Sequence, residues 1–337
     1  MSYTASAMRE QLPNQVAQAL FSRILGPRKR STANRLLEFP ARRVRRFWAA
    51  HGDPLITHRI GGHDLLMPLS SDLPIILTKW PHYATNLVRL ATIKTADHEN
   101  TAIVDIGSNV GDSVALLRTA LSSPILCVEG DELFVGLLRR NMRYVADVEI
   151  EEAFVKTSSD DVERVQSVSR QAGTAALVPS ASGLPLARPV RSLSEILDSH
   201  ARFSSPGFIK IDTDGADSQI IINNQDIFTR SRPVVFFEFD PILAARIGCE
   251  NPYRAIEALA EVGYDGALVY AHTGELMLAS RAIEMPLWRD LERYILTHGP
   301  GQYYDIALFH SDDHELFERV TATEREYFND MARRHRW

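Results

Sequence analysis

The spacing of apolar residues along the chain changes near residue 100. After that point, short continuous apolar runs alternate with segments whose apolar residues recur every three or four positions. Continuous runs predict buried strands, and the recurring spacing predicts helices that cover them. The repeated order of strand, helix and strand is typical of an α/β fold with helices on both faces of a mostly parallel sheet.

The predicted elements follow directly from these patterns. Central strands are predicted at 103–106, 124–129, 148–155, 207–212 and 233–240. Helices are predicted at 113–121, 131–144, 218–228 and 253–262, and after residue 315. A late pair of strands at 267–270 and 303–309 predicts a seven-stranded sheet with a reversed edge. Residues 156–189 predict a loop-rich insertion with one short hairpin, and Ser192 or Ser194 caps the helix that follows.

The sequence predicts two parts. Residues 1–95 form a basic, mainly helical region on the substrate side, and residues 96–337 form the main domain. Helical spacing covers 12–50 and 80–94, Gly61-Gly62 predicts a hairpin turn, and Ile75–Leu77 reads as a strand. The aromatic residues that follow either form a wall over a substrate pocket or pack in the core: Trp80, His82 and Tyr83.

Composition limits the classes of function. The chain has 337 residues, 45% of them hydrophobic, and a net charge of −6, which excludes a global nucleic-acid signature. Its two cysteines, Cys127 and Cys249, have no partner spacing for a disulfide framework or a zinc site. No apolar stretch approaches the roughly 18 residues that span a bilayer, and residues 1–11 do not resemble a signal peptide. A cytoplasmic location is the expectation, and a homodimer is compatible with it.

The N-terminal region concentrates positive charge. Its basic residues are Arg23, Arg28, Lys29, Arg30, Arg35, Arg42, Arg43, Arg45 and Arg46, against the single acid Glu38. One interpretation is a patch for an anionic partner, such as a phosphorylated glycan or, at a membrane surface, a lipid head group. The other is a solvated helical face, because the charges recur on several faces rather than one.

The stretch from Ile103 to Asp112 carries the first chemistry. A strand ends in Asp105, a turn holds Gly107 and Gly111, and a helix follows. Two glycines let the backbone approach a ligand closely, and the helix N-terminus offers free N–H groups. The spacing G-x-x-x-G lacks the third glycine of a dinucleotide fingerprint and the lysine of a phosphate loop. Asp105 would repel a pyrophosphate, so the turn favours a ligand that carries a positive charge.

Acids at later strand tips extend this site. Glu129 ends the second strand, where doubly wound folds place an acid that accepts hydrogen bonds from ribose hydroxyls. The alternative is a surface acid. Asp212, Asp214 and Asp217 end another strand, and crowded carboxylates are costly to bury unless they meet a cation or share a proton. They mark a site, or else they cap the helix that follows.

Four motifs in order resemble one family. V-D-I-G-S-N-V-G at 104–111, V-E-G-D at 128–131, I-K-I-D-T-D-G-A-D at 209–217 and R-P-V-V-F-F-E at 232–238 resemble the FkbM family of S-adenosylmethionine-dependent methyltransferases. The third resembles that family's K-I-D-x-E-G-x-E signature, with both glutamates shortened to Asp214 and Asp217. Gly130 stands where the family often has proline, and Ser194 stands where it has an acid. The resemblance covers roughly residues 100–310.

The resemblance implies a Rossmann-like class I methyltransferase fold and O-methylation of a hydroxyl on a sugar, glycolipid or secondary metabolite. By position, the methionine part of S-adenosylmethionine would lie at Asp105, Gly107, Ser108, Asn109 and Gly111. Glu129 would hold the ribose, Glu152 and Ala153 would flank the adenine, and Asp212 would face the reacting end.

Methyl transfer to a hydroxyl requires alignment and a base. The candidate bases are the carboxylates at the strand tips: Asp212, Asp214, Glu238 and Asp240. Asp212 and Glu238 are favoured because both end central strands. The alternative is that two or three of them bind Mg²⁺, which would lower the pKa of the hydroxyl instead. The metal-free site is the preferred prediction.

Three functions follow from these observations. The first is an S-adenosylmethionine-dependent O-methyltransferase that acts on a hydroxyl of a carbohydrate or glycoconjugate, for which the basic region favours an anionic acceptor. The second is an O-methyltransferase that tailors a polyketide or peptide. The third is a non-catalytic nucleotide-binding protein of the same fold, against which the costly acids argue.

Overall fold

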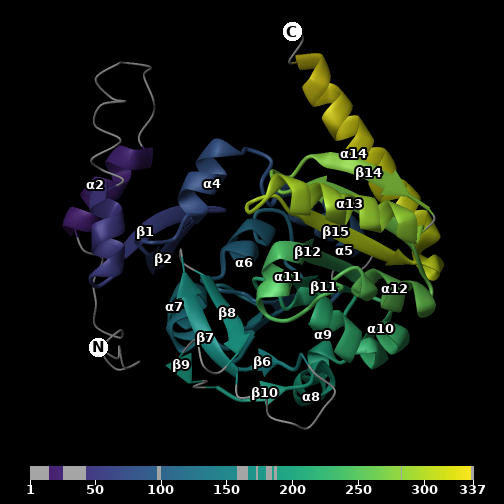
Figure 1. Cartoon of the computed structure of the whole chain (residues 1–337), viewed down its shortest axis with the longest axis horizontal. Helices are drawn as coiled ribbons and strands as arrows, with labels where there is room; N and C mark the ends of the chain where they lie inside the picture. The colour runs from purple at the N-terminus through teal and green to yellow at the C-terminus, as the bar shows by residue number, and fades with distance from the viewer. Residues whose placement is uncertain are drawn as a thin grey trace.

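The apolar runs after residue 100 form one eight-stranded sheet, ordered β14-β13-β15-β12-β11-β3-β4-β5. Four of its strands, β11, β12, β14 and β15, are labelled in Figure 1. Its strands are β3 (Ile103–Ile106), β4 (Ile125–Val128), β5 (Val148–Glu151), β11 (Phe208–Ile211), β12 (Val234–Phe239), β13 (Tyr264–Ala271), β14 (Leu276–Ser280) and β15 (Tyr304–His310). The computed structural model describes residues 15–25, 43–96, 100–157, 166–171, 174–179, 184–185, 188–281 and 283–334.

The strand directions confirm a mostly parallel sheet and correct its edge. β5, β4, β3, β11 and β12 are parallel, whereas β15 runs antiparallel between β12 and β13. The sheet has eight strands rather than the predicted seven, because β14 adds an edge strand. β14 is antiparallel to β13, so the edge is reversed as predicted, but the late return strand β15 lies inside the sheet. A turn at Gly274, whose φ is +94°, folds β14 back onto β13.

Helices cover both faces of the sheet, as predicted. Alternate strand residues point to opposite faces, so Ile103 and Phe208 lie in one apolar cluster and Val104 and Ile209 in another. The first face is covered by α5 (Thr85–Thr95), α6 (Asp112–Leu117), α7 (Glu132–Met142) and α14 (His314–Arg334). The second face is covered by α8 (Leu193–Ser199), α9 (Asp217–Asn223), α10 (Gln225–Ser231), α12 (Arg254–Glu261) and α13 (Met285–His298).

Asn224 divides the helix predicted at 218–228 into α9 and α10. Its side-chain amide donates to the carbonyl of Ile220, and its side-chain oxygen accepts from the N–H of Leu193. These bonds hold Asn224 at φ −131°, outside the helical range, so the chain starts a new helix there.

The β-hairpin of the N-terminal region packs against α6 and α7, and α2 packs against that hairpin, to one side of the sheet (Figure 1). Residues 15–25 (α2, Gln15–Leu25) and 43–50 are helical as predicted, and residues 26–42 lie outside the described part of the chain. The hairpin of β1 (Leu55–Ile60) and β2 (His63–Pro68) turns at Gly61 and Gly62, as expected. A Cβ on Gly61 would lie 2.0 Å from the carbonyl oxygen of Ala115, so the turn needs glycine there.

The strand predicted at Ile75–Leu77 is wrong. This segment belongs to a helix, α4 (Leu73–Lys79), that follows Asp72. Pro74 lies in its first turn, where the fixed φ of proline favours a helix and its missing N–H is not needed. The short apolar run is therefore one face of a helix, which apolar content alone cannot distinguish from a strand.

The insertion after β5 contains the predicted hairpin. β7 (Gln166–Gln171) pairs with β8 (Thr174–Pro179), and β9 (Leu184–Pro185) pairs with β7. The strand predicted at 148–155 divides into β5 and β6 (Phe154–Val155), because β6 leaves the sheet to pair with β10 (Val190–Arg191). Ser192 caps α8 and forms a capping box with Glu195, which decides between the two predicted caps.

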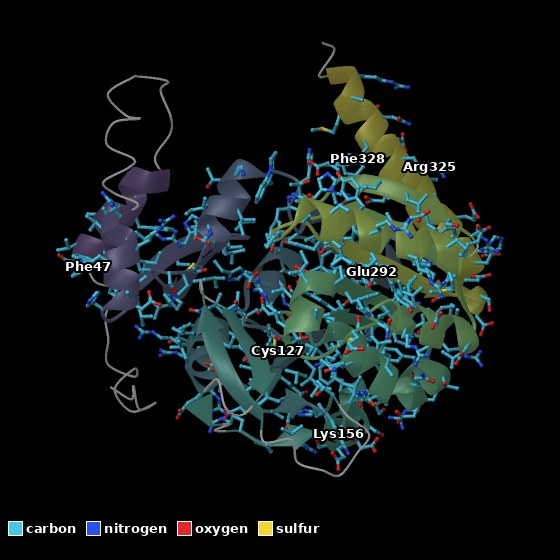
Figure 2. The ribbon with its side chains drawn as sticks, in the orientation of Figure 1. Phe47, Cys127, Lys156, Glu292, Arg325 and Phe328 are labelled. Carbon is cyan, nitrogen blue, oxygen red and sulfur yellow. The ribbon has the colours of Figure 1, made fainter. Side chains whose placement is uncertain are left out.

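Both cysteines are free and buried, and Cys127 lies in the middle of the domain (Figure 2). Burial, the largest cause, and then the nearby Asp105 charge raise the pKa of the Cys127 thiol far above its ordinary value. The thiol therefore stays protonated and acts as a small core residue, as the sequence predicts.

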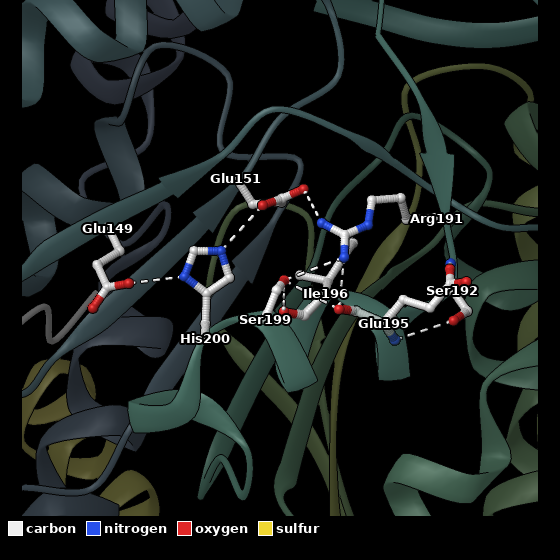
Figure 3. Close-up of polar contacts among 8 residues, drawn as sticks. All are labelled: Glu149, Glu151, Arg191, Ser192, Glu195, Ile196, Ser199 and His200. Atoms are coloured by element: carbon white, nitrogen blue, oxygen red, sulfur yellow. Dashed lines mark hydrogen bonds and ion pairs between the residues drawn. The ribbon is translucent and has the colours of Figure 1, made fainter.

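A polar network protects the edge strand β5 (Figure 3). The ring of His200 bridges two carboxylates of β5, with Nδ1 2.8 Å from Glu149 and Nε2 3.1 Å from Glu151. Arg191 pairs with the other oxygen of Glu151 at 2.7 Å. Burial alone would lower the pKa of His200, but the two carboxylates outweigh it and raise that pKa. Charged side chains on an exposed edge also oppose pairing with another chain.

Replacing His200 with Gln should reduce stability at pH 5.5 and have little effect at pH 8.5. Because the folded-state pKa is raised, the charge-dependent stabilisation is complete below about pH 6.5 and is lost as pH rises through the folded-state pKa. The expected loss at pH 5.5 is about 0.5–1 kcal/mol by urea denaturation, since the network is partly exposed. In a Glu149→Gln, Glu151→Gln background the effect should disappear. A loss of equal size at both pH values would contradict this assignment.

Candidate active site

A cavity of about 420 Å³ opens at the edge of the sheet where β3, β4, β11 and β12 end. Parallel strands bring their carboxyl ends to one edge, and the crevice there is the usual ligand site of open α/β sheets. Its volume lies within the roughly 300–1,000 Å³ of small-molecule pockets. Most of the predicted site residues line it: Gly107, Asn109, Glu129, Ala153, Asp212, Asp214, Glu238 and Asp240.

Gly107 sets the distance between two strand ends. Its φ is +79°, and a Cβ there would lie 1.8 Å from the backbone carbonyl oxygen of Asp212. Its N–H donates to the carbonyl of Val128 at 2.9 Å. The turn after β3 is therefore held against β4 and β11 at once, and no side chain fits at this position.

Ser108 and Gly111 hold the same turn from outside the cavity lining. The Ser108 hydroxyl donates to the carbonyl of Asp105 at 2.6 Å. A Cβ on Gly111 would lie 2.6 Å from the terminal methyl of Met142 on α7. These two residues shape the backbone on which Asn109, in a left-handed conformation with φ +48°, faces the cavity.

Asp105 lies beneath the cavity and is paired with Lys210. Its side chain is fully buried, and its Oδ1 lies 3.0 Å from the ammonium of Lys210. Lys210 lines the cavity and lies 3.3 Å from Asp212, whose side chain is 44% exposed. Burial would lower the pKa of Lys210, but Asp105, Asp212 and Asp112 raise it well above its ordinary value. Lys210 is therefore charged and links the two strand-tip acids.

Glu129 is fixed by the backbone around it. One carboxylate oxygen accepts from the N–H of Asn109 at 2.9 Å, and the other accepts from the N–H of Asp131 at 2.8 Å. Burial is the largest influence on the Glu129 carboxyl and raises its pKa to about 7. A carboxylate held by backbone donors and facing a cavity can accept ligand hydroxyls in a fixed geometry.

The two residues predicted to flank adenine have different positions. Ala153 is buried and lines the cavity, whereas Glu152 forms ion pairs with Arg139 and Arg188 and does not line it. The ring of Phe154 lies beside them in the lining, where a Cβ on Gly130 would collide with it. Gly130, in place of the family's proline, therefore leaves room for an aromatic wall.

The carboxylates after β11 and β12 gather at the other side of the cavity. Burial, followed by the Asp212, Asp217 and Asp214 charges, raises the pKa of Glu238 well above its ordinary value. Asp214, at φ +54°, lines the cavity and has a similarly raised pKa, first from burial and then from Asp212.

Two of the strand-tip acids have local roles. Asp217 accepts from the N–H and hydroxyl of Thr213 and lies outside the cavity lining, so it acts as a turn residue. Asp240 caps α11 (Pro241–Arg246) through the N–H groups of Ile242 and Leu243 and also lines the cavity.

The sequence patterns did not point to several residues at or near the cavity. Tyr303 lines the cavity, and Asp305 lies opposite Glu238 in the β15–β12 pairing. Burial first, and then Asp212, raise the pKa of Asp305 to about 7. Because β15 runs opposite to the parallel strands, its first residues lie at the edge of the sheet where those strands end. Recognising 303–309 as the reversed strand would therefore have placed Tyr303 and Asp305 near the cavity. Asp112, whose pKa burial raises to about 6, also lines the cavity.

Only one of the three predicted aromatic wall residues lines the cavity. Tyr83 does so, while Trp80 packs its edge on His272 with ring centroids 5.4 Å apart. The His82 ring lies 3.2 Å from the hydroxyl of Tyr327 on α14. Among the described residues, no group of three or more His, Cys, Asp or Glu side chains is arranged to hold a metal ion.

Replacing Gly107 with Ala should lower the free energy of unfolding by at least about 2 kcal/mol. The new Cβ would require a strained left-handed residue and would push Asp212 away from β3. Gly136 on α7 is the matched control, because a Cβ there meets nothing within 4 Å. Gly136→Ala should instead stabilise the helix by about 0.5–1 kcal/mol. Equal urea midpoints for the two variants would contradict the close approach at Gly107.

Solved structures similar to this chain are distant. One is precorrin-6y C5,15-methyltransferase from Geobacter metallireducens GS-15, which is 12% identical in sequence. The match covers 67% of this chain and 86% of that chain, with a TM-score of 0.34. An O-methyltransferase from Bacillus cereus in complex with SAH is 13% identical. The match covers 67% of this chain and 80% of that chain, with a TM-score of 0.37. A methyltransferase FkbM from Methylobacillus flagellatus KT is 13% identical. The match covers 50% of this chain and 40% of that chain, with a TM-score of 0.31. The chain matches no curated protein.

A family comparison identifies the domain. Residues 105–265 match the family model of the methyltransferase FkbM domain. The matched stretch begins at the acid before the glycine turn and contains Glu129, the acids at 212–217 and Glu238. The chain therefore carries a methyltransferase FkbM domain over residues 105–265.

Proposed function

We propose that the protein is an S-adenosylmethionine-dependent O-methyltransferase that acts on a hydroxyl of a carbohydrate or glycoconjugate. The observation that carries this proposal is the joint presence of Glu129, the Gly107 turn and the Lys210–Asp212 pair in one cavity. Each of them corresponds to one part of the cofactor, and the remaining acids provide a base for a hydroxyl.

The residues present fit the cofactor. Glu129 is aimed by two backbone N–H groups and can accept both ribose hydroxyls. Ala153 and the ring of Phe154 offer an apolar surface for adenine. Gly107 and Asn109 line the cavity at the turn after β3, where the methionine moiety can reach them. When bound, the cofactor supplies a methyl group already activated on a sulfonium.

The carboxylates supply the base. Glu238 lines the cavity, and its raised pKa makes it a stronger base than an ordinary carboxylate once it is ionised. We assign it the acceptance of the proton from the acceptor hydroxyl. Asp212, exposed to the cavity and paired with Lys210, faces the positive charge of the cofactor. Burial and the Asp212 charge raise the pKa of Asp214, so its carboxyl favours the protonated form and can donate a hydrogen bond in the cavity.

One basic side chain of the cavity lining offers a contact for an anionic group of the acceptor. Arg246 lines the cavity from α11 and is exposed, so it can pair with a phosphate or carboxylate group of a glycan. In the N-terminal region, Arg45 has a structural role, since it donates to the carbonyls of Leu69, Ser70 and Ser71 at 2.8 Å each. Arg45 therefore organises the loop that borders the cavity.

No helix in the described ranges combines the length and apolar character needed to cross a bilayer. A cytoplasmic location, a homodimer and peripheral membrane contact through the N-terminal region stay predictions.

The acceptor class can be tested by transfer of radiolabelled methyl from S-adenosylmethionine to glycans and lipid extracts. Label in glycan or glycolipid fractions supports the proposal. Label only in polyketide or peptide fractions would move the acceptor to a secondary metabolite. Cofactor binding without any transfer would favour a non-catalytic protein.

Replacing Glu129 with Gln should weaken S-adenosylmethionine binding about 10- to 100-fold, because a charge-assisted hydrogen bond to a ribose hydroxyl contributes about 1.5–3 kcal/mol. The measurement is isothermal titration calorimetry at pH 8, above the pKa of about 7, where the carboxylate is ionised. Glu132→Gln, three residues further on in α7 and outside the lining, is the matched control and should bind as the wild type does. Unchanged affinity in Glu129→Gln would reject the ribose assignment.

Methyl transfer should be unaffected by EDTA. The ammonium of Lys210 lies 3.0 Å from Asp105 and 3.3 Å from Asp212, so it already neutralises the charges that a bound cation would meet. The measurement compares initial rates in about 5 mM EDTA and in about 5 mM Mg²⁺, a concentration that saturates ordinary carboxylate sites. Loss of activity in EDTA with rescue by Mg²⁺ would overturn the metal-free mechanism.

A further inference from the structure

One wall of the cavity comes from outside the stretch that matches the family. Residues 105–265 contribute the glycine turn, Glu129 and the acids. The rest of the lining includes Tyr83 and four residues at 71–73 and 76 from the N-terminal region, and Tyr303, directly before β15. Segments outside the family stretch therefore contribute to the cavity, beside the residues that fit the cofactor.

The hydroxyls of Tyr83 and Tyr303 point to a binding role. Both side chains are half-buried in the cavity lining, and neither hydroxyl is among the buried polar atoms that lack a partner. The two hydroxyls are therefore open to the cavity, where a ligand that enters it can accept hydrogen bonds from them. Both lie among the same carboxylates, since burial first and then Asp212, Glu238 and Asp305 raise their pKa values well above 10.

The raised pKa values define what the two hydroxyls can do. Each phenol stays protonated at any working pH and can only donate a hydrogen bond to a neighbouring oxygen or accept one. Neither can serve as a phenolate base. The carboxylate of Glu238, which lines the same cavity, is left as the proton acceptor.

The loop that carries Tyr83 is held from two sides. A Cβ on Gly274, in the β13–β14 turn, would lie 2.0 Å from the carbonyl oxygen of His82, so the two backbones touch. On the other side, the His82 ring meets the Tyr327 hydroxyl at 3.2 Å. Ala84, directly after Tyr83, is held at φ +58°, a strained conformation that persists only when the surroundings impose it.

The same scaffold links the two tyrosines. His272 packs against Trp80 on one side and against the ring of Tyr303 on the other, with centroids 5.4 and 5.6 Å away. Tyr83 and Tyr303 are thus placed by one set of contacts among segments far apart in sequence.

We propose that Tyr83 and Tyr303 bind the acceptor, donating hydrogen bonds to the oxygen that is methylated and to a neighbouring oxygen, with Glu238 as the proton acceptor. The proposal rests on the proposed function. It names the acceptor class more closely as a polyol with adjacent oxygens, because two donors on one wall match two oxygens of one sugar ring. It also assigns acceptor choice to the segments outside 105–265.

The test uses Tyr83→Phe, Tyr303→Phe and the double variant of the full chain. Each change removes one hydroxyl and keeps the ring. Each single variant should lower the catalytic efficiency of methyl transfer to glycan extract about 3- to 10-fold, the value of one neutral hydrogen bond, and the double variant about 10- to 100-fold. The Kd for S-adenosylmethionine and the urea midpoint should stay unchanged. Tyr294→Phe, on the exposed face of α13, is the control and should not alter transfer.

The outcomes are distinguishable. Transfer by the double variant at the wild-type rate would overturn this inference and leave the proposed function intact. Weakened S-adenosylmethionine binding in either single variant would make the tyrosine a cofactor contact and also overturn it. Binding of S-adenosylmethionine by the wild type without transfer to any glycan or lipid extract would remove the proposed acceptor class, and the inference with it.

Discussion

The buried contact between Lys210 and Asp105 is the constraint on which the site depends. Asp105 is fully buried at the end of β3, and Lys210 is on β11, the strand beside it. A buried carboxylate without a partner is costly, and removing one member of such a pair typically costs about 3–5 kcal/mol. The pair therefore fixes β3 against β11 where the glycine turn leaves the sheet. Lys210 then extends the link to Asp212, the acid that faces the cavity.

Around this pair the site divides into two halves with different physical character. The cofactor half is made of backbone geometry, since Gly107 has no room for a side chain and Glu129 is held by two N–H groups. The other half is made of side-chain charge. Asp214 and Glu238 have raised pKa values because burial and mutual repulsion oppose ionisation, so a positively charged ligand would be stabilised there.

Much of the site could be predicted because parallel sheets obey simple rules. Strand tips gather at one edge, so the order of strands along the chain is enough to group Asp105, Glu129 and Asp212. Their individual positions could not be predicted. Asp105 and Glu152 look like ligand contacts in the sequence, but one lies beneath the cavity with Lys210 and the other pairs with arginines. Whether an acid faces a cavity or a cation depends on neighbours that are distant in sequence.

Local patterns in the amino-acid sequence were sufficient for the α/β fold, the succession of parallel strands along the chain and the family, because periodicity and strand-tip motifs are local. Tertiary packing was needed to insert β15 inside the sheet and to make α4 a helix. It also brought Tyr83 and Tyr303, 220 positions apart (303 − 83), to one cavity. These features depend on contacts between residues that are distant in sequence. The chain entropy lost and the contact energy gained are spread over many residues, so no short segment carries a pattern for them.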